Sequence, residues 1–186
     1  MTTRWRPDFD PNHLYFVTTT AAERAHIFQR DIVKRIIVDA LYFASVMNRT
    51  VLYAFVVMPN HVHAIIQCVQ DLPPKVWARA FKTSAAQLIV RLYQVEQNQV
   101  ALDLLASMVT RPDKQAYKVW EDGYLPKSIV TPAFLEQKLT YTHNNPVQPH
   151  WRLVGVPEDY AWSSARYYLV GEPCMIPVQD VRELMV

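Results

Sequence analysis

Cysteine, glycine and long apolar runs are all scarce in this sequence. The two cysteines, Cys68 and Cys174, form no CxxC pair, which argues against a disulfide framework or a cysteine zinc site and predicts reduced thiols in a cytoplasmic protein. With three glycines and no Gly/Ser-rich tract, the chain offers neither a flexible linker nor a glycine-rich phosphate loop. No apolar run reaches the length of about 18 residues that a membrane-spanning helix needs, and the first residues lack the apolar segment of a signal peptide.

Apolar material for a core is abundant. Hydrophobic residues make up 51% of the chain and charged residues 19%, a balance that excludes a disordered protein. A length of 186 residues suits one domain, alone or with an extension. The formal net charge of +2 does not by itself indicate a nucleic-acid partner, although a basic groove could exist within such a total.

The first half of the chain alternates strand and helix patterns. Residues 13–20, 50–57 and 61–67 are rich in aromatic and β-branched side chains and predict strands, the last two joined by a Met-Pro-Asn turn. Residues 30–48 carry apolar side chains at helical spacing and predict an amphipathic helix. The apolar stripe of this helix is expected to consist of Ile32, Ile36, Ile37, Ala40 and Phe43.

The second half continues the alternation. Residues 73–108 predict a helical segment, and residues 116–130 predict an irregular hairpin or a fourth strand. Within this helical segment, Leu88, Leu92 and Val95 are expected to lie on one face.

A further helix is expected to begin at Thr131 as N-cap with Pro132 at its first position, and to end before Pro146. The resulting order β-α-β-β-α-β-α fits an α+β fold, a ferredoxin-like sandwich with an antiparallel sheet. We expect a single domain with its core at about residues 10–146. The proline- and aromatic-rich residues 147–186 would form a C-terminal extension that wraps this core.

The sharpest local feature is the segment MPNHVHAIIQ. Alternate side chains of a strand share a face, so His61 and His63 point the same way. Val62, Ala64 and Ile66 then point into a core, and the histidine face is expected to lie outside it. Two imidazoles one strand repeat apart can bind one metal ion jointly. The alternative is that both are ordinary surface histidines on a half-buried strand.

The segment KLTYTHNNPV holds a second group of polar residues. Tyr141 and Asn145 lie one helical turn apart on the same face, with Lys138 on the same stripe. Leu135 and Leu139 lie beside this stripe and would pack on the sheet. Asn145 precedes a proline and so lies at the helix end, where its side chain is free to serve a site. The alternative for Tyr141 is a half-buried aromatic residue on an amphipathic helix.

Three blocks in this order resemble the REP-associated tyrosine transposases: HVH after a Met-Pro-Asn turn, YTHNNPV, and PEDYAWSSARYYLVG. These proteins are chromosomal relatives of the IS200/IS605 transposases, in the HUH endonuclease superfamily of bacteria. The resemblance extends from YFVTT to Tyr168 and implies one Y1-type transposase domain. The chain departs from the family after NPV, where QPHWRLVG replaces a pattern that often has a small residue and glycine. The resemblance assigns no DNA contact to residues 73–108.

The resemblance implies a role for each site residue. In that family the two histidines of the His-hydrophobic-His motif bind a divalent metal, a role that falls on His61 and His63. The third ligand is a polar residue four positions after the nucleophilic tyrosine, so Asn145 would be the ligand and Tyr141 the nucleophile. Two neutral imidazoles and one amide suit Mg²⁺ or Mn²⁺, with the imidazoles favouring Mn²⁺.

The implied activity is that of a metal-dependent single-stranded DNA endonuclease and strand transferase. A tyrosine held in line with the leaving 3′-oxygen would attack a phosphodiester and form a 5′-phosphotyrosine, while the metal offsets the developing charge. That linkage keeps the phosphodiester energy, so the step needs no ATP. The expected partner is single-stranded or hairpin DNA, and a homodimer that exchanges the tyrosine helix is an alternative to a monomer.

Single-stranded DNA is bound by cationic and aromatic side chains. The residues expected to contact it are Arg4, Arg6, Lys82, Lys127 and Lys138. Six further cationic or aromatic residues are candidates for this role, and most of them are expected to be surface charges or core aromatics: Trp5, Lys75, Trp77, Arg79, Lys118 and Trp120.

Three other functions compete with the transposase. An HUH-type nuclease of the replication or relaxase kind would make the same cut without transposition, but the NNPV and SSARYY segments favour the transposase. A catalytically silent DNA-binding relative would keep the fold, but the chain has all four expected site residue types. A metal-binding module with no nucleic-acid role would fail a strand-specific DNA shift assay.

Overall fold

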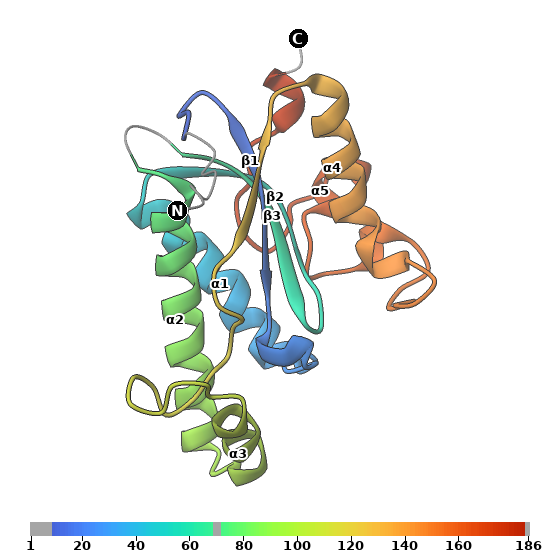
Figure 1. Ribbon diagram of the computed structural model, residues 1–186. Helices are drawn as coiled ribbons and strands as arrows, with labels where there is room; N and C mark the ends of the chain where they lie inside the picture. The colour runs from blue at the N-terminus through green and yellow to red at the C-terminus, as the bar shows by residue number, and fades with distance from the viewer. Residues whose placement is uncertain (1–8, 69–71, 185–186) are drawn as a thin grey trace.

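In the computed structural model, which describes residues 9–68 and 72–184, four strands form an antiparallel sheet (Figure 1). The strands are β1 (Leu14–Thr20), β2 (Thr50–Val57), β3 (His61–Cys68) and β4 (Leu125–Ile129). They lie in the order β2-β3-β1-β4, so β1 has both β3 and β4 as hydrogen-bonded neighbours. This arrangement confirms the predicted α+β class and the antiparallel sheet of a ferredoxin-like sandwich.

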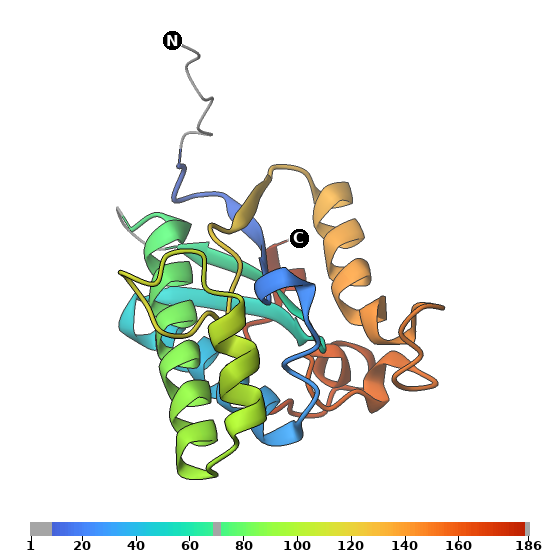
Figure 2. The same cartoon turned by 60° about the horizontal axis from the view of Figure 1, so that its bottom comes forward.

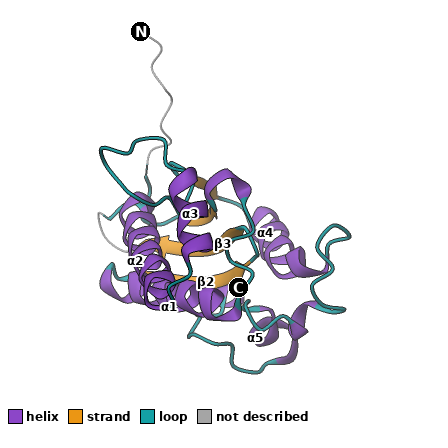
Figure 3. Cartoon of the chain, turned by 90° about the horizontal axis from the view of Figure 1, so that it is seen from below, coloured by secondary structure: helices purple, strands orange, loops and turns teal. Residues whose placement is uncertain are grey.

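Helices cover both faces of the sheet. They are α1 (Asp31–Met47), α2 (Pro74–Val95), α3 (Gln99–Ser107), α4 (Pro132–Asn144) and α5 (Ala165–Val170). The views in Figures 1, 2 and 3 agree that α1 and α2 lie together on one face and α4 on the other. Within the two described stretches of the chain, none of the helices is both long and apolar enough to cross a membrane.

The buried stripe of α1 is rotated relative to the expected one. Its buried apolar positions recur every three or four residues at Val33, Ile37, Leu41 and Ala44. The expected core residues Ile32 and Phe43 are instead 46% and 53% exposed, so their assignment was wrong. This helix carries apolar side chains on two adjacent stripes, and periodicity alone could not say which one meets the sheet.

The buried face of α2 is not the face that carries Leu88 and Val95. Its buried side chains include a strict four-residue row: Trp77, Phe81, Ala85, Ile89 and Tyr93. Leu88 and Val95 are 44% and 73% exposed. The expected helical segment is also broken: Gln97 has a positive φ of 53°, and the side chain of Asn98 caps α3. The row with the larger aromatic side chains faces the sheet because it buries more apolar surface.

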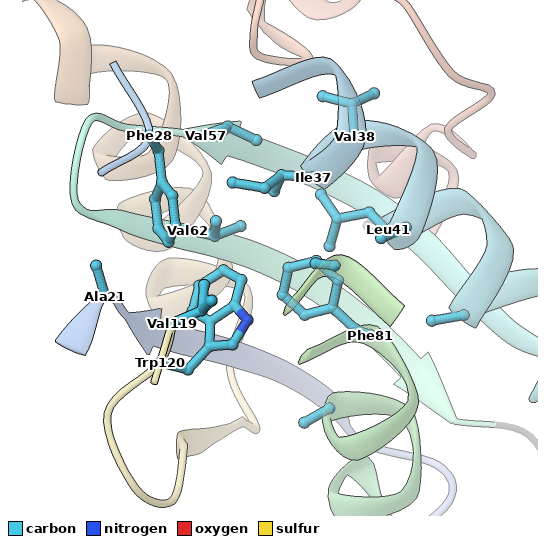
Figure 4. Packing of buried hydrophobic residues seen from close by; sticks show 14 of the residues in the cluster. Ala21, Phe28, Ile37, Val38, Leu41, Val57, Val62, Phe81, Val119 and Trp120 are labelled. Carbon is cyan, nitrogen blue, oxygen red and sulfur yellow. The ribbon is translucent and has the colours of Figure 1, made fainter. Parts of the chain in front are cut away.

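The main core lies between the sheet and the α1–α2 pair. Figure 4 shows Ile37 and Leu41 of α1, Phe81 of α2 and Val62 of β3 pointing into the same space, with Trp120 beside them. The rings of Phe81 and Trp120 are 5.3 Å apart between centroids. This core fixes one face of the sheet and leaves the other face for α4.

A β-bulge lets β2 serve both faces. Leu52 and Ala54 pair with consecutive residues of β3, which leaves Tyr53 as an extra residue in the strand. Leu52 and Phe55 consequently belong to the main core, whereas Tyr53 and Ala54 pack in a second cluster beneath α4.

The C-terminal residues run along the outer edge of β2. The N–H of Val57 donates to the carbonyl oxygen of Trp162 at 2.8 Å, and the N–H of Ser164 donates to that of Phe55 at 3.0 Å. This pairing satisfies backbone groups that an open edge would expose. The division of the chain into a core and an extension remains a prediction.

Tyr168 joins this C-terminal segment to the bulge of β2. Its buried hydroxyl donates to the carbonyl oxygen of Tyr53 at 2.9 Å and accepts the N–H of Val181 at 3.0 Å. Burial raises the pKa of Tyr168, so the phenol stays protonated and able to donate. The neighbouring Tyr167 is half-buried, and its hydroxyl makes no hydrogen bond within the described residues.

We predict that Tyr168→Phe lowers the free energy of unfolding by about 1–3 kcal/mol, because it leaves the Val181 N–H and the Tyr53 carbonyl without their buried partner. Tyr167→Phe is the matched control and should change stability by less than about 0.5 kcal/mol. Urea denaturation followed by circular dichroism measures both. Equal midpoints for the two variants would show that the hydroxyl does not join these segments.

Candidate active site

The pairing of β1 with β3 builds the floor of the site. His63 lies opposite Thr18, and His61 lies opposite Thr20, so these polar side chains share the sheet face beneath α4. Between the histidines, Val62 points to the opposite face and packs in the main core. The two imidazole centroids are 4.7 Å apart. Strand alternation thus brings the two predicted metal ligands together.

His63 is packed more tightly than the sequence indicated. It is only 4% exposed, and its ring stacks on Phe16 with the centroids 5.0 Å apart. The ring of Tyr141 meets it edge-on at 5.2 Å. The expectation that the histidine face lies outside the core is therefore wrong for His63, because an aromatic cluster beneath α4 encloses it.

Each histidine can direct an unprotonated nitrogen into the site. In His61, Nδ1 lies 2.7 Å from the amide oxygen of Asn60, which only accepts, so the proton is on Nδ1 and Nε2 carries a lone pair. In His63, Nδ1 lies 2.9 Å from Oγ1 of Thr18 and can donate to it. The Nε2 of His63 is buried and has no hydrogen-bond partner within the described residues.

Burial keeps both imidazoles neutral. Loss of hydration lowers the pKa of His61 to about 4, opposed by a smaller rise from a hydrogen-bonding contact with Asn145. Burial also lowers the pKa of His63 well below its usual value, and the charges of His61 and Lys138 lower it further. Neutral imidazole is the form that binds a metal ion.

The start and end of α4 are set by local sequence. The hydroxyl of Thr131 accepts the N–H of Phe134 at 3.2 Å, which caps the helix where the sequence predicted. After Asn144 the chain tightens into a 3-10 turn at Asn145–Val147. The cap and the 3-10 turn therefore set the start and the end of α4.

Three predicted site residues come from this helix and the turn after it. Tyr141 is 43% exposed and borders the same cavity as the histidines, as does Asn145, which is 3% exposed. The Nζ of Lys138 lies 5.5 Å from the centroid of the Tyr141 ring and 5.1 Å from that of Phe16. The structure thus brings together a tyrosine, an amide, a lysine and two histidines from separate parts of the chain.

An open cavity of about 570 Å³ connects these side chains. Its lining includes seven residues to which the sequence assigned no role: Thr18, Thr20, Arg24, Asn60, Gln148, His150 and Trp151. None of the described residues that border the cavity carries a carboxylate, so its lining suits an anionic ligand. The two threonines had a signal in the sequence, because they alternate along β1 as the histidines do along β3. The others come from turns that carry no periodic pattern.

The donor set for a metal ion is a mixed one. Within residues 9–68 and 72–184, no three His, Cys, Asp or Glu side chains are grouped as metal ligands. A third protein ligand beside the two histidines would therefore have to be the amide of Asn145, which contacts His61.

Two of the predicted DNA contacts lie close to Tyr141. Lys127 is exposed on β4 and lies opposite Phe16 in the strand register. Burial lowers the pKa of Lys138, and the positive charge of Lys127 lowers it further. They form a positive flank on the Tyr141 side of the cavity.

The other predicted DNA contacts are not brought to this cavity. Lys82 lies on α2, across the sheet, and its Nζ donates to the backbone carbonyls of Glu121 at 2.7 Å and Gly123 at 2.5 Å. Arg4 and Arg6, like Trp5, lie outside the described residues.

Three of the further residues considered for DNA contact are interior. Trp77 is 1% exposed and donates to Ser45, and Trp120 is 6% exposed and donates to the backbone of Lys82. Neither indole can stack on a base. Lys118 is also buried, whereas Lys75 and Arg79 are exposed on α2.

Comparison with known proteins places this geometry in context. A family model described as "Transposase IS200 like" matches residues 11–103. A solved structure of a REP-associated tyrosine transposase bound to a REP hairpin has a similar fold, with a TM-score of 0.65 and 16% identity over 97% of this chain and 93% of that one. A transposase structure from Deinococcus radiodurans R1 gives a TM-score of 0.47 and 17% identity over 77% of this chain and 97% of that one. No curated protein matches.

The family match spans half of the 186 residues. It includes β1, β2 and β3 with both histidines, and it ends before α4. The place of Tyr141 in the site therefore rests on its contact with His63 in the structure, not on the family match. The similar fold of the REP-associated relative extends over nearly the whole chain, α4 included. On this evidence the chain belongs to the family of IS200-like transposases.

Proposed function

We propose that this transposase cuts and rejoins single-stranded DNA through a phosphotyrosine formed on Tyr141, with a divalent metal ion held by His61, His63 and Asn145. The observation that carries the proposal is the buried Nε2 of His63, which lacks a hydrogen-bond partner within the described residues and belongs to a ring 5.2 Å from that of Tyr141. A buried polar atom without a partner costs about 1–3 kcal/mol. A ligand at this atom would offset that cost.

The donor chemistry fits Mg²⁺ or Mn²⁺. Two neutral imidazole nitrogens and one amide oxygen occupy only part of the coordination sphere of such an ion and leave positions for phosphate oxygens and water. When bound, the ion polarises a phosphoryl oxygen and offsets the charge that develops on the phosphate. The hydrogen bonds of the two Nδ1 atoms with Thr18 and Asn60 would orient the imidazole rings toward the ion.

Tyr141 supplies the nucleophile. Its phenolic oxygen bonds to phosphorus, the bond between phosphorus and the 3′-oxygen breaks, and the phenolic proton passes to that 3′-oxygen directly or through water. The products are a 5′-phosphotyrosine and a free 3′-hydroxyl, so one ester replaces another and the step is reversible. An exposure of 43% lets a DNA strand reach the hydroxyl.

Lys138 and Lys127 would assist this step by charge. The Lys138 ammonium lies 5.5 Å from the Tyr141 ring centroid and favours the phenolate character that grows during attack. Lys127 adds a second positive charge on the same side, which would attract the strand. Lys82 donates to a backbone carbonyl on the other side of the sheet, so the proposed DNA path does not include it.

The DNA partner is proposed from the relative of similar fold, which is bound to a REP hairpin. We extend single-stranded or hairpin DNA to this chain and place its activity in the bacterial cytoplasm. Tyr141, both histidines and Asn145 of one chain already border one cavity, so the proposal requires no second copy of the chain.

We predict that Tyr141→Phe abolishes the covalent protein–DNA adduct and lowers cleavage on the order of 10³-fold or more, because only the attacking oxygen is lost. The assay incubates protein, Mn²⁺ and an end-labelled single strand, then separates the denatured products by electrophoresis. Tyr124→Phe is the control, since Tyr124 is half-buried against the main core. An adduct that persists in Tyr141→Phe, or maps to another tyrosine, would contradict the assignment.

We predict that His63→Gln weakens Mn²⁺ binding at least about tenfold, because a neutral amide is a poorer ligand and reaches the position less rigidly. Electron paramagnetic resonance of free Mn²⁺ measures this without any DNA. His13→Gln is the matched control, since His13 bonds to Ser128 elsewhere on the sheet. Equal Mn²⁺ affinity in both variants, with unchanged circular dichroism, would remove His63 from the metal site.

We predict at least about tenfold faster cleavage of a single strand than of the same sequence in a blunt duplex. A single strand can turn its phosphate in line with Tyr141, and its free bases can stack on aromatic residues such as Trp151, each stack contributing about 1–3 kcal/mol. Rates with Mn²⁺ under single-turnover conditions make the comparison. Equal rates on the two substrates would refute this preference.

A further inference from the structure

The end of the cavity away from Tyr141 has no role yet in the proposed bond-breaking step. Ring contacts run from Tyr141 to His63 at 5.2 Å, from His63 to His61 at 4.7 Å, and from His61 to Trp151 at 5.9 Å. Trp151 and Arg24 border the cavity at this far end, beyond His61. A DNA strand that passes Tyr141 and both histidines would continue toward these two residues.

Arg24 has no negative partner there. It is exposed, it is the one Lys or Arg among the cavity-lining residues, and it takes part in no ion pair within the described stretches of the chain. Among the lining residues that the structure describes, none has a carboxylate that could neutralise it. A free guanidinium at the edge of a cavity suits an incoming anion.

The backbone that carries Arg24 is strained. Glu23 and Arg24 have φ values of 52° and 54°, in the left-handed region that residues other than glycine rarely adopt. The turn is held from outside: the N–H of Glu23 donates to the Glu121 carboxylate at 2.6 Å, and the carbonyl of Arg24 accepts from the Asn60 amide at 3.0 Å. Strain of this kind persists where the surrounding structure imposes it, and it concentrates where a side chain must be placed accurately.

The Asn60 side chain ties this turn to the metal-site histidine. Its Nδ2 donates to the carbonyl of Arg24, while its Oδ1 accepts from Nδ1 of His61 at 2.7 Å. The backbone carbonyl of Asn60 also accepts the N–H of Ala21, just before the turn, at 2.8 Å. One residue therefore sets the position of Arg24 relative to His61.

We propose that Arg24 is a further catalytic residue, whose guanidinium binds the non-bridging oxygens of the DNA backbone phosphate beside His61, and that Asn60 is the positioning residue for both. The inference rests on the proposed function of the site. Arginine suits this role because its planar fork holds two phosphate oxygens at once, which fixes the strand in orientation as well as in place.

The test measures DNA binding against salt in Tyr141→Phe protein without metal, so that no cleavage occurs. Each neutralised phosphate of a single strand contributes about 0.7 to the slope of log affinity against log salt concentration. Arg24→Gln should lower that slope by about 0.7 and weaken binding about tenfold at low salt. Arg91→Gln, an exposed arginine on α2 across the sheet, is the matched control and should keep the slope.

Arg24→Lys separates charge from geometry. It should keep the slope, because the positive charge remains, and lower single-turnover cleavage with Mn²⁺ in protein that retains Tyr141, because an ammonium cannot hold the phosphate through two parallel bonds. An oligonucleotide series with one neutral methylphosphonate per strand should contain one position that weakens binding to Arg24 protein and not to Arg24→Gln.

An unchanged slope in Arg24→Gln overturns the proposal even if cleavage slows, because a purely structural role would leave the number of neutralised phosphates unaltered. The proposed function fails by a different result: an adduct that survives Tyr141→Phe removes the nucleophile and does not touch the salt slope.

Discussion

The register of β1 against β3 is the constraint on which the site depends. It places Thr18 opposite His63 and sends both histidines to the face beneath α4. A shift of one residue would turn every side chain of β3 over, burying the imidazoles in the main core and moving Val62 to the polar cavity. Helices cover both faces of the sheet, so a one-residue shift would cost buried apolar surface. The register of β3 is therefore strongly specified.

Phe16 connects this register to the helix that carries the nucleophile. Its ring contacts His63 at 5.0 Å, Tyr141 at 6.1 Å and the Lys138 ammonium at 5.1 Å. The same aromatic packing thus excludes water from a histidine, sets the position of α4 above β1, and provides a π-face for the lysine. The contacts that pack α4 on the sheet are therefore the same contacts that position the site residues.

The sequence predicted the sheet and the helix capped by Thr131, because each depends on local periodicity or on a cap. The approach of Tyr141 to the histidines was implied only by the family resemblance, because it depends on the packing of α4 against the sheet. It did not predict which stripe of α1 meets the sheet, since Ile32 and Phe43 were as apolar as the residues actually buried. The far end of the cavity was missed for a related reason. Arg24 and Trp151 come from turns, and their positions depend on tertiary hydrogen bonds such as those of Asn60, which leave no pattern along the chain.

Three imidazoles lie on the α4 side of the sheet, and their desolvation links the stability of the fold to pH. His63 and His143 are buried, and His61 is half-buried. Burial lowers the pKa of His61 and of His143 to about 4 and that of His63 well below its usual value, whereas in the unfolded chain each would titrate near 6.5. Between about pH 6.5 and pH 4 the unfolded state therefore binds more protons than the folded state, and the free energy of unfolding falls as the pH falls. Above pH 6.5 these three histidines do not lower the free energy of unfolding. Three histidines on one side of the sheet therefore make the stability of the whole fold sensitive to acid.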